Sequence, residues 1–239
     1  MAWHNKNTYG YVRTSQEAID NATMVYNILA SLGWHLKPIC AMLGNVEQES
    51  GYNPWRWQSE VVLPVGDSRI GYIGGPNTAH AYGLCQQDPA AKYIDRPYAQ
   101  ALPDYAPNYS NRQGGQNDGT AQLQYLHWIC SDTSAGEWSN PWGSSYYMPF
   151  ATFIVDEAHT VEYLVHTFLV GYERGGWSDT RVTAAQYWYN YFSDNPPTPP
   201  EPPEPPTPTP LDPVFIAEIY IAAKKRKGNF IFEKRWYEK

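Results

Sequence analysis

Hydrophobic positions near the start of the chain follow the period of an α-helix. The first apolar stripe consists of Ile19, Val25, Ile28, Leu29 and Leu32. Thr14-Ser15-Gln16-Glu17 precedes this stripe and has the pattern of a capping box, which is typical of a helix start. Gly33 follows it, and glycine commonly ends a helix. The pattern therefore predicts a helix that begins near residue 15 and ends at Gly33.

A second helix is predicted from about Leu36 to Ser50, with Pro38 in its first turn, where proline is tolerated. Its inner face consists of Ile39, Met42, Leu43 and Val46. Glycine and proline recur between residues 55 and 82, and together with the run at 69–75 they predict a small β-hairpin or an irregular loop. Further helices are predicted near 89–93, 120–129, 160–174 and 182–192, with a surface loop at 97–118.

The composition changes sharply at Asn195. Eleven of the eighteen residues at 196–213 are proline, which favours a polyproline II spacer over a helix or a sheet. The apolar stretch at 214–223 and the basic cluster at 224–227 are too short to fold alone. We predict a folded domain at 1–193, a linker at 194–213 and a docking peptide at 214–239. A membrane-surface segment is the alternative for the last part.

Charge and composition exclude several function classes. The formal net charge is −7, which makes specific nucleic-acid binding a poor prediction. Residues 211–239 differ from the rest, because they hold seven Lys and Arg against four Asp and Glu. No signal peptide and no apolar run that could cross a membrane is visible. The three cysteines and six histidines form no CxxC, HxH or HExxH motif, so neither a metal nor a cofactor is predicted.

Glu49 is the most informative single residue of the sequence. It follows Val46 by three positions and Met42 by seven, so it shares the apolar face of the second predicted helix. Partial desolvation and the negative end of the helix dipole would both raise the pKa of its carboxyl group. A carboxylic acid held protonated near neutral pH is what glycosidic cleavage needs. A frayed, solvated helix end is the alternative interpretation.

Three segments resemble the phage tail-tip lysozymes, which are peptidoglycan-degrading domains related to goose-type lysozymes and lytic transglycosylases. The first is Ile39-Cys-Ala-Met-Leu-Gly-Asn-Val-Glu-Gln-Glu-Ser50 with Asn53-Pro54. The second is Tyr82-Gly-Leu-Cys-Gln-Gln87 with Pro89-Ala90, and the third is Phe168-Leu-Val-Gly-Tyr-Glu-Arg174. Tyr187-Trp-Tyr189, near the end of the domain, also fits. The resemblance spans about residues 14–192 in the same order.

The resemblance implies an α+β, predominantly α fold: a lysozyme-like helical domain with a small β-hairpin. It implies that Glu49 is the general acid. Because glycosidases usually need a second carboxylate, Asp67, in the loop after the catalytic helix, is the candidate for it, with Asp88 as the alternative. The residues that it implies for substrate binding are Gln86, Gln87, Tyr82, Tyr172, Ser50 and Trp57. Trp55 and Tyr72 are further candidate sugar platforms. Glu173 and Arg174 are predicted to form a structural ion pair.

The function predicted on this basis is cleavage of peptidoglycan glycan strands by a phage tail enzyme. It would be carried on the virion, act at the host cell wall and dock onto other tail proteins through 214–239. A lytic transglycosylase, a catalytically inactive wall-binding protein, and a cysteine amidase or peptidase using Cys85 or Cys130 with His127 or His166 are the alternatives. No domain for peptide cleavage follows the proline-rich segment, so no peptidase activity is predicted.

Overall fold

The structure is a computed structural model that describes residues 3–4, 13–58, 80–107 and 118–197. Residues 1–199 group into one compact unit, to which all the described residues belong. Most of the predicted linker at 194–213 and the whole predicted docking peptide at 214–239 lie outside the described residues, so both stay predictions.

The first two helices agree with the sequence pattern. Helix α1 spans Gln16–Ser31, and the Oγ of its N-cap Ser15 accepts a hydrogen bond from the Ala18 backbone N–H at 3.3 Å. The capping side chain is thus Ser15, one position beyond the predicted Thr14. Gly33 follows the helix with φ +86°, a conformation that glycine adopts at little cost. Helix α2 spans Leu36–Ser50, as predicted, and Gly51 follows it in a left-handed conformation.

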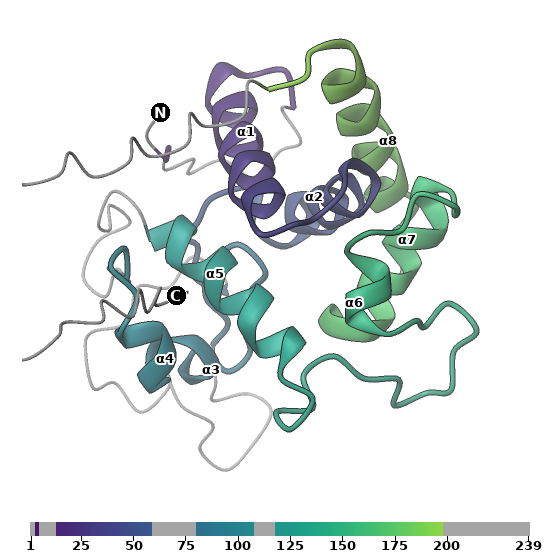
Figure 1. Cartoon of the computed structure of the whole chain (residues 1–239). Helices are drawn as coiled ribbons and strands as arrows, with labels where there is room; N and C mark the ends of the chain where they lie inside the picture. The colour runs from purple at the N-terminus through teal and green to yellow at the C-terminus, as the bar shows by residue number, and fades with distance from the viewer. Residues whose placement is uncertain (1–2, 5–12, 59–79, 108–117, 198–239) are drawn as a thin grey trace, which may run out of the picture. The chain divides into compact units, whose positions relative to one another are not determined.

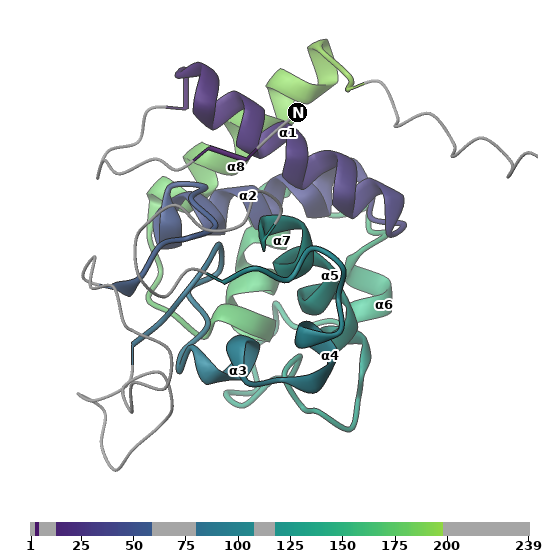
Figure 2. The ribbon, with the colours of Figure 1, turned by 90° about the vertical axis from the view of Figure 1, so that its left-hand side faces the viewer.

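Helix α2 lies at the centre of the unit. It packs against α1, α7 (Val161–Phe168) and α8 (Asp179–Asp194). Figure 2 shows α1 and α8 on one side of α2, with α7 and α5 on the other. The sequence of α2 explains this position, because every residue from Pro38 to Glu47 is buried. A helix that is apolar on nearly all sides needs partners all round.

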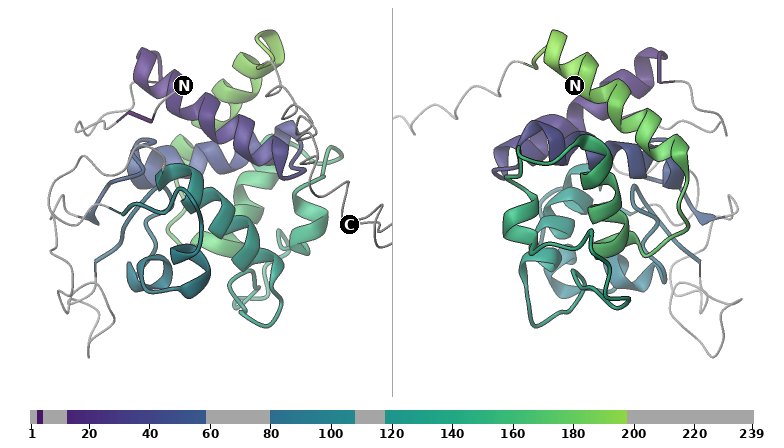
Figure 3. Two further views of the ribbon diagram at one scale, coloured as in Figure 1. Left: turned by 60° about the vertical axis from the view of Figure 1, so that its left-hand side comes forward. Right: turned by 90° about the vertical axis from the view of Figure 1, so that its right-hand side faces the viewer.

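The remaining helices are short, apart from α5 (Asp118–Ser131). They are α3 (Ala91–Ile94), α4 (Pro97–Gln100) and α6 (Phe150–Phe153). The α3–α4–α5 group lies on the other side of α2 from α8 (Figures 1 and 3). Helix α4 falls where the sequence predicted only a loop, and α6 was not predicted. The helix predicted over 160–174 is α7 followed by a π-helical turn at Leu169–Glu173.

The predicted β-hairpin is replaced, in the part that the structure describes, by two isolated bridges. Trp57 pairs with Tyr82, and Tyr82 pairs with Gln87, both antiparallel. The run at 69–75, on which the hairpin prediction rested, lies outside the described residues. The described part is therefore helical with irregular connections, and the β component of the predicted fold class is reduced to these bridges.

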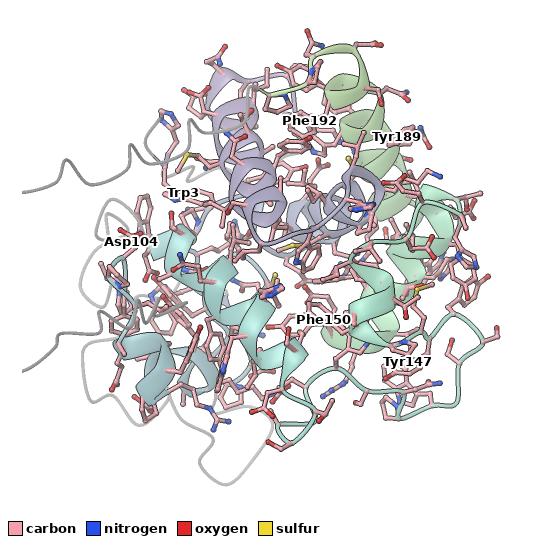
Figure 4. All side chains as sticks on the ribbon, in the orientation of Figure 1. Trp3, Asp104, Tyr147, Phe150, Tyr189 and Phe192 are labelled. Carbon is pink, nitrogen blue, oxygen red and sulfur yellow. The ribbon has the colours of Figure 1, made fainter. Side chains whose placement is uncertain are left out.

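Aromatic side chains fill much of the core. Phe192 projects from α8 toward α1 and meets Tyr26 with ring centroids 4.9 Å apart (Figure 4). Phe150 meets Trp34 and Trp138 edge to face, at 5.6 and 5.1 Å. This burial accounts for part of the high Trp and Tyr content, because large flat rings bury much apolar area per residue. Among the described helices, none is long and apolar enough to cross a membrane.

Candidate active site

Glu49 lies in the last turn of α2 and forms an ion pair with Arg181, in the first turn of α8. The Arg181 Nη2 donates to Glu49 Oε1 at 2.6 Å. The Glu49 side chain keeps 22% of its surface exposed, whereas Arg181 keeps only 5%. Its neighbour Glu47 points in another direction, toward Arg13 and Tyr52. Glu49 is therefore the carboxylate of this helix end that solvent can reach.

The packing of α8 on α2 brings Arg181 to this position. A Cβ atom added to Gly44 would lie 2.2 Å from the Arg181 carbonyl oxygen and 2.8 Å from the Ala185 Cβ. Only a glycine allows this approach of the two helices. Arg181 Nη1 then donates to Asn45 Oδ1 at 3.0 Å, so the guanidinium is fixed from two positions on α2. The contact predicted for Glu49 was with apolar neighbours alone, and the structure corrects this by adding a buried cation.

Glu173 ends the π-helical turn and is a second carboxyl group beside Glu49. Burial, and then the negative charge of Glu49, raise its pKa well above the ordinary value, while Arg181 and a hydrogen bond from the Cys85 thiol act in the opposite direction. Its Oε1 is buried and has no hydrogen-bond partner in the part of the chain that the structure describes. Gly175 adjoins the same group, because a Cβ there would lie 3.9 Å from Glu49 Oε1 and 3.4 Å from Arg181 Nη2.

The predicted ion pair between Glu173 and Arg174 is wrong. Arg174 adopts a left-handed conformation with φ +54° and turns away. Its Nη2 donates to the Ser139 hydroxyl at 2.9 Å and to the Glu137 carbonyl. The reason is the π-helical turn, which shifts the following residues relative to an α-helix. π-Helical turns of this kind are frequent at functional sites.

The turn at residues 82–87 also contributes to the surroundings of Glu49, because its Cys85 thiol donates a hydrogen bond to Glu173. The turn is held by Gln122 of α5, whose Oε1 accepts from the Leu84 backbone N–H at 2.7 Å and whose Nε2 donates to the Pro54 carbonyl at 2.6 Å. Gly83 has φ +89°, and a Cβ there would lie 2.4 Å from Gln122 Oε1. Glycine is thus required at position 83 both by its backbone angle and by the close approach of Gln122 of α5.

The polar residues predicted to bind substrate are engaged with the protein. Gln86 has φ +44°, and its Nε2 donates to the carbonyls of Arg56 and Gly83 at 3.0 and 2.9 Å. Gln87 Nε2 donates to the Tyr172 hydroxyl, which ties the turn to the π-helical turn. Ser50 Oγ donates back to the Val46 carbonyl at 3.2 Å. Gln87 and Tyr172 are the pair among them that joins two of the three motif segments.

Two predicted aromatic platforms lie in the core. Trp57 and Tyr82 are 1% and 0% exposed, and their rings pack together with centroids 4.7 Å apart. The Tyr82 hydroxyl donates to Asp118 at 2.8 Å. A sugar would find no exposed ring face on either residue. Trp55 is buried as well. Asp67 and Tyr72 lie outside the described residues, and Asp88 is exposed at the start of a cis peptide bond to Pro89.

Comparison with known proteins identifies the family. The family model described as phage tail lysozyme matches residues 20–192, which covers all three motif segments. The chain belongs to the phage tail lysozyme family. It is also 28% identical over 190 residues to morphogenesis protein 1 of Bacillus phage B103, an alignment that covers 78% of this chain and 42% of the relative. The chain thus spans less than half of the length of that relative.

The geometry disfavours a cysteine nucleophile in this phage tail lysozyme. Burial raises the pKa of both Cys85 and Cys130 well above the ordinary value, which is the reverse of what a reactive thiolate needs. Cys85 donates to Glu173, not to a histidine. His127 Nδ1 is in turn the hydrogen-bond partner of Trp34 Nε1 at 3.0 Å. Among the described residues, no group of three or more His, Cys, Asp and Glu side chains is arranged to hold a metal ion.

Sequence reasoning missed Arg181 as a member of the site. Arg181 lies 132 positions from Glu49, one residue before the start of the predicted last helix. One weak signal was available, since a basic residue at the N-terminal end of a helix is opposed by the helix dipole and needs another reason to be there. For Glu173, the available signal was its position in the Tyr-Glu-Arg segment. The prediction gave Glu173 only a structural role, as the ion-pair partner of Arg174.

Proposed function

We propose that this phage tail lysozyme cleaves the glycan strands of bacterial peptidoglycan, with Glu49 as the general acid. The observation that carries the proposal is the convergence of the three motif segments on one carboxylate. The negative charge of Glu49, in the first segment, raises the pKa of Cys85 in the second and of Glu173 in the third, and the Glu49 side chain retains contact with solvent. Glycosidic cleavage requires a carboxyl group that reaches the bridging oxygen and hands it a proton.

Other features support a polar, partly enclosed setting for this chemistry. Arg181 and the buried Glu173 flank Glu49, so the charge of the carboxylate left after proton transfer is met by a guanidinium at 2.6 Å. Carboxyl pairs in different environments commonly divide acid and base roles between them. Asp67 stays a candidate second carboxylate by its place in the sequence alone. Gln87 and Tyr172, which adjoin the same group, are the substrate-contacting residues that we retain.

The biological setting proposed is the virion. Family membership points to a tail component, and local opening of the host wall at genome ejection is the role that such an enzyme would serve. Residues 214–239 would hold the enzyme to other tail proteins across the proline-rich spacer. A semi-rigid polyproline segment of this length reaches roughly 55 Å, which would let the domain move away from its attachment point.

The decisive experiment compares the wild-type chain with Glu49→Gln on purified Gram-positive cell walls. We expect Glu49→Gln to lower the rate of clearing at least about a thousandfold, because the amide cannot donate the required proton. Glu17→Gln, an exposed carboxylate in the first turn of α1, is the matched control and should clear walls at the wild-type rate. Wall clearing by Glu49→Gln at the control rate would refute the proposal.

The products decide between the two glycosidic routes. Hydrolysis leaves new reducing ends on the glycan strands, whereas the intramolecular transglycosylase route leaves anhydro-sugar ends. Binding of walls with release of neither product would instead indicate an inactive, wall-binding protein. We expect reducing ends, released by the wild type and by Glu17→Gln but not by Glu49→Gln.

A further inference from the structure

Trp177 is a large aromatic side chain that lies on the surface, two residues before α8. It is 42% exposed, whereas most tryptophans of the described residues are in the core. A single exposed apolar residue is ordinary, so its surroundings decide whether it has a role. Gly175 and Gly176, which precede it, are exposed as well. A Cβ added to Gly176 would meet no atom of the described residues within 4 Å, so the surface beside the indole is open.

Two aromatic rings support Trp177 from one side. The His166 imidazole of α7 stacks on the indole, with ring centroids 3.4 Å apart and planes 6° apart. Tyr146, in the loop between α5 and α6, stacks on the same imidazole at 4.2 Å and 13°. Two rings parallel to one imidazole at these distances lie on its opposite faces, because on a single face they would overlap. The order is therefore Tyr146, His166, Trp177, which leaves the outer face of the indole to a ligand.

Asp179 holds the edge of the same indole. Its Oδ1 accepts from the Trp177 Nε1 at 3.0 Å, and the residue is exposed. A ring that is stacked on one face and hydrogen-bonded at its edge is already oriented, so a ligand that binds to it loses little affinity to side-chain ordering. The carboxylate has further lone pairs that can accept from a hydroxyl beside the ring. A flat apolar face next to such an acceptor suits a sugar, which presents C–H groups on its faces and hydroxyls at its rim.

Trp177 is joined to the carboxylate of the proposed acid by a short segment without side chains. The Cβ position of Gly175 lies 3.9 Å from Glu49 Oε1. Consecutive Cα atoms are about 3.8 Å apart, so the Trp177 Cα lies within roughly 13 Å of Glu49 Oε1. A polysaccharide that passes Glu49 covers this distance in a few sugar units.

We propose that Trp177, supported by His166 and Tyr146, is a binding platform for a sugar of the peptidoglycan glycan strand, a few units away from the bond that is cut. This inference rests on the proposed function, because that function makes the glycan strand the substrate. The exposed apolar surface is one ring bordered by glycines and a carboxylate, which is too small for a protein partner but matches a sugar ring. Trp177 takes the role that the sequence assigned to Trp57 and Tyr82, whose rings are in the core.

The test is the binding of long glycan strands, stripped of their stem peptides, to the full chain. The parent for these measurements is Glu49→Gln, so that the strands stay intact. Trp177→Leu removes the flat ring but keeps an apolar side chain, whereas Trp177→Phe keeps a flat ring. In titration calorimetry we expect Trp177→Leu to raise the Kd about tenfold and Trp177→Phe to stay within about threefold of the parent.

Tyr98→Leu is the matched control. Tyr98 is also an exposed, stacked ring, since it is 38% exposed and lies on Trp128 with centroids 4.1 Å apart. It belongs to α4, on the other side of α2 from α8 (Figure 1), and its variant should keep the Kd of the parent. With Glu49 restored, Trp177→Leu should raise the KM for strand cleavage about tenfold and leave kcat within about threefold. Circular dichroism establishes that each variant is folded.

The outcomes separate this inference from the proposed function. A Kd for Trp177→Leu equal to that of Tyr98→Leu would overturn the platform, and so would a Trp177→Phe that binds as weakly as Trp177→Leu. Failure of the Glu49→Gln parent to bind peptide-free strands would overturn it too. None of these results bears on whether Glu49→Gln clears walls. Wall clearing by Glu49→Gln at the wild-type rate would instead overturn the acid assignment, while weaker strand binding by Trp177→Leu would still support the platform.

Discussion

Arg181 lies with its Nη2 2.6 Å from Glu49 Oε1, across 132 positions of the chain. The arginine is almost fully buried, and the glutamate is not. The pair therefore has one end fixed in the interface of α2 with α8 and the other open to solvent. This arrangement holds the Glu49 carboxylate in one place while leaving it accessible to solvent.

Arg181→Met should weaken the packing of α8 on α2, because the guanidinium of this α8 residue donates to both Asn45 and Glu49 of α2. Chemical denaturation measures the effect. The unfolding free energy should fall by about 2 kcal/mol, because Asn45 loses a buried donor while the part-exposed Glu49 is rehydrated. Lys92→Met on α3 is the charge-matched control. An unfolding free energy for Arg181→Met equal to that of Lys92→Met would contradict this expectation.

Gly44→Ala should destabilise the fold although alanine is the better helix former. The added Cβ would meet the Arg181 carbonyl oxygen at 2.2 Å, so α8 must shift away from α2. Overpacking of this kind costs about 1–3 kcal/mol, more than the gain in helix propensity of about 1 kcal/mol. Chemical denaturation measures the loss. Gly176→Ala, where an added Cβ has nothing within 4 Å, should leave the unfolding free energy within about 0.5 kcal/mol of the wild type.

Asp118→Ala should lower the unfolding free energy by about 2–4 kcal/mol. Asp118 accepts from the hydroxyls of Tyr82 and Tyr93 at 2.8 and 2.7 Å, from Gln122 Nε2 at 2.7 Å and from the Ala106 backbone N–H at 3.0 Å. Alanine would leave these buried donors unpaired, which loosens the support of the turn at 82–87. Asp95→Ala, at an exposed position, is the control.

The cost of Asp118→Ala should also depend on pH. Burial raises the pKa of Asp118, so the folded state holds this proton more tightly than the unfolded chain does. The stability from that proton is fully present below the unfolded pKa of about 3.9 and is lost as pH rises through the folded value. The loss caused by the substitution should thus be larger at about pH 4 than at about pH 7. A cost that grows with pH would contradict the raised pKa.

Local patterns predicted the elements whose signals lie in adjacent turns. Helix α2 agrees at both ends, because Pro38 marks its first turn and the apolar face of α2 is continuous. The short helices α4 and α6 escaped prediction, since four residues are too few to show a period. The π-helical turn escaped too, because one inserted residue leaves no mark in the spacing of apolar positions.

The site was predictable only where a motif named a residue. Glu49 and the turn at 82–87 came from the sequence, but the contacts of Glu49 with Arg181 and Glu173 depend on how α8 and the π-helical turn pack on α2. Trp57 and Tyr82 show the opposite error. Their amphipathic rings suit a sugar surface and a protein core equally well in a sequence, and only packing places them in the core.

The contact between Glu49 and Arg181 has a consequence for the order in which the site is assembled during synthesis. Glu49 leaves the ribosome early, but the arginine that anchors it belongs to α8, the last helix among the described residues. A nascent chain that still lacks α8 carries the acid without its anchor and without the charge balance around it. The Glu49–Arg181 contact therefore forms only after α8 has been synthesised and has packed onto α2.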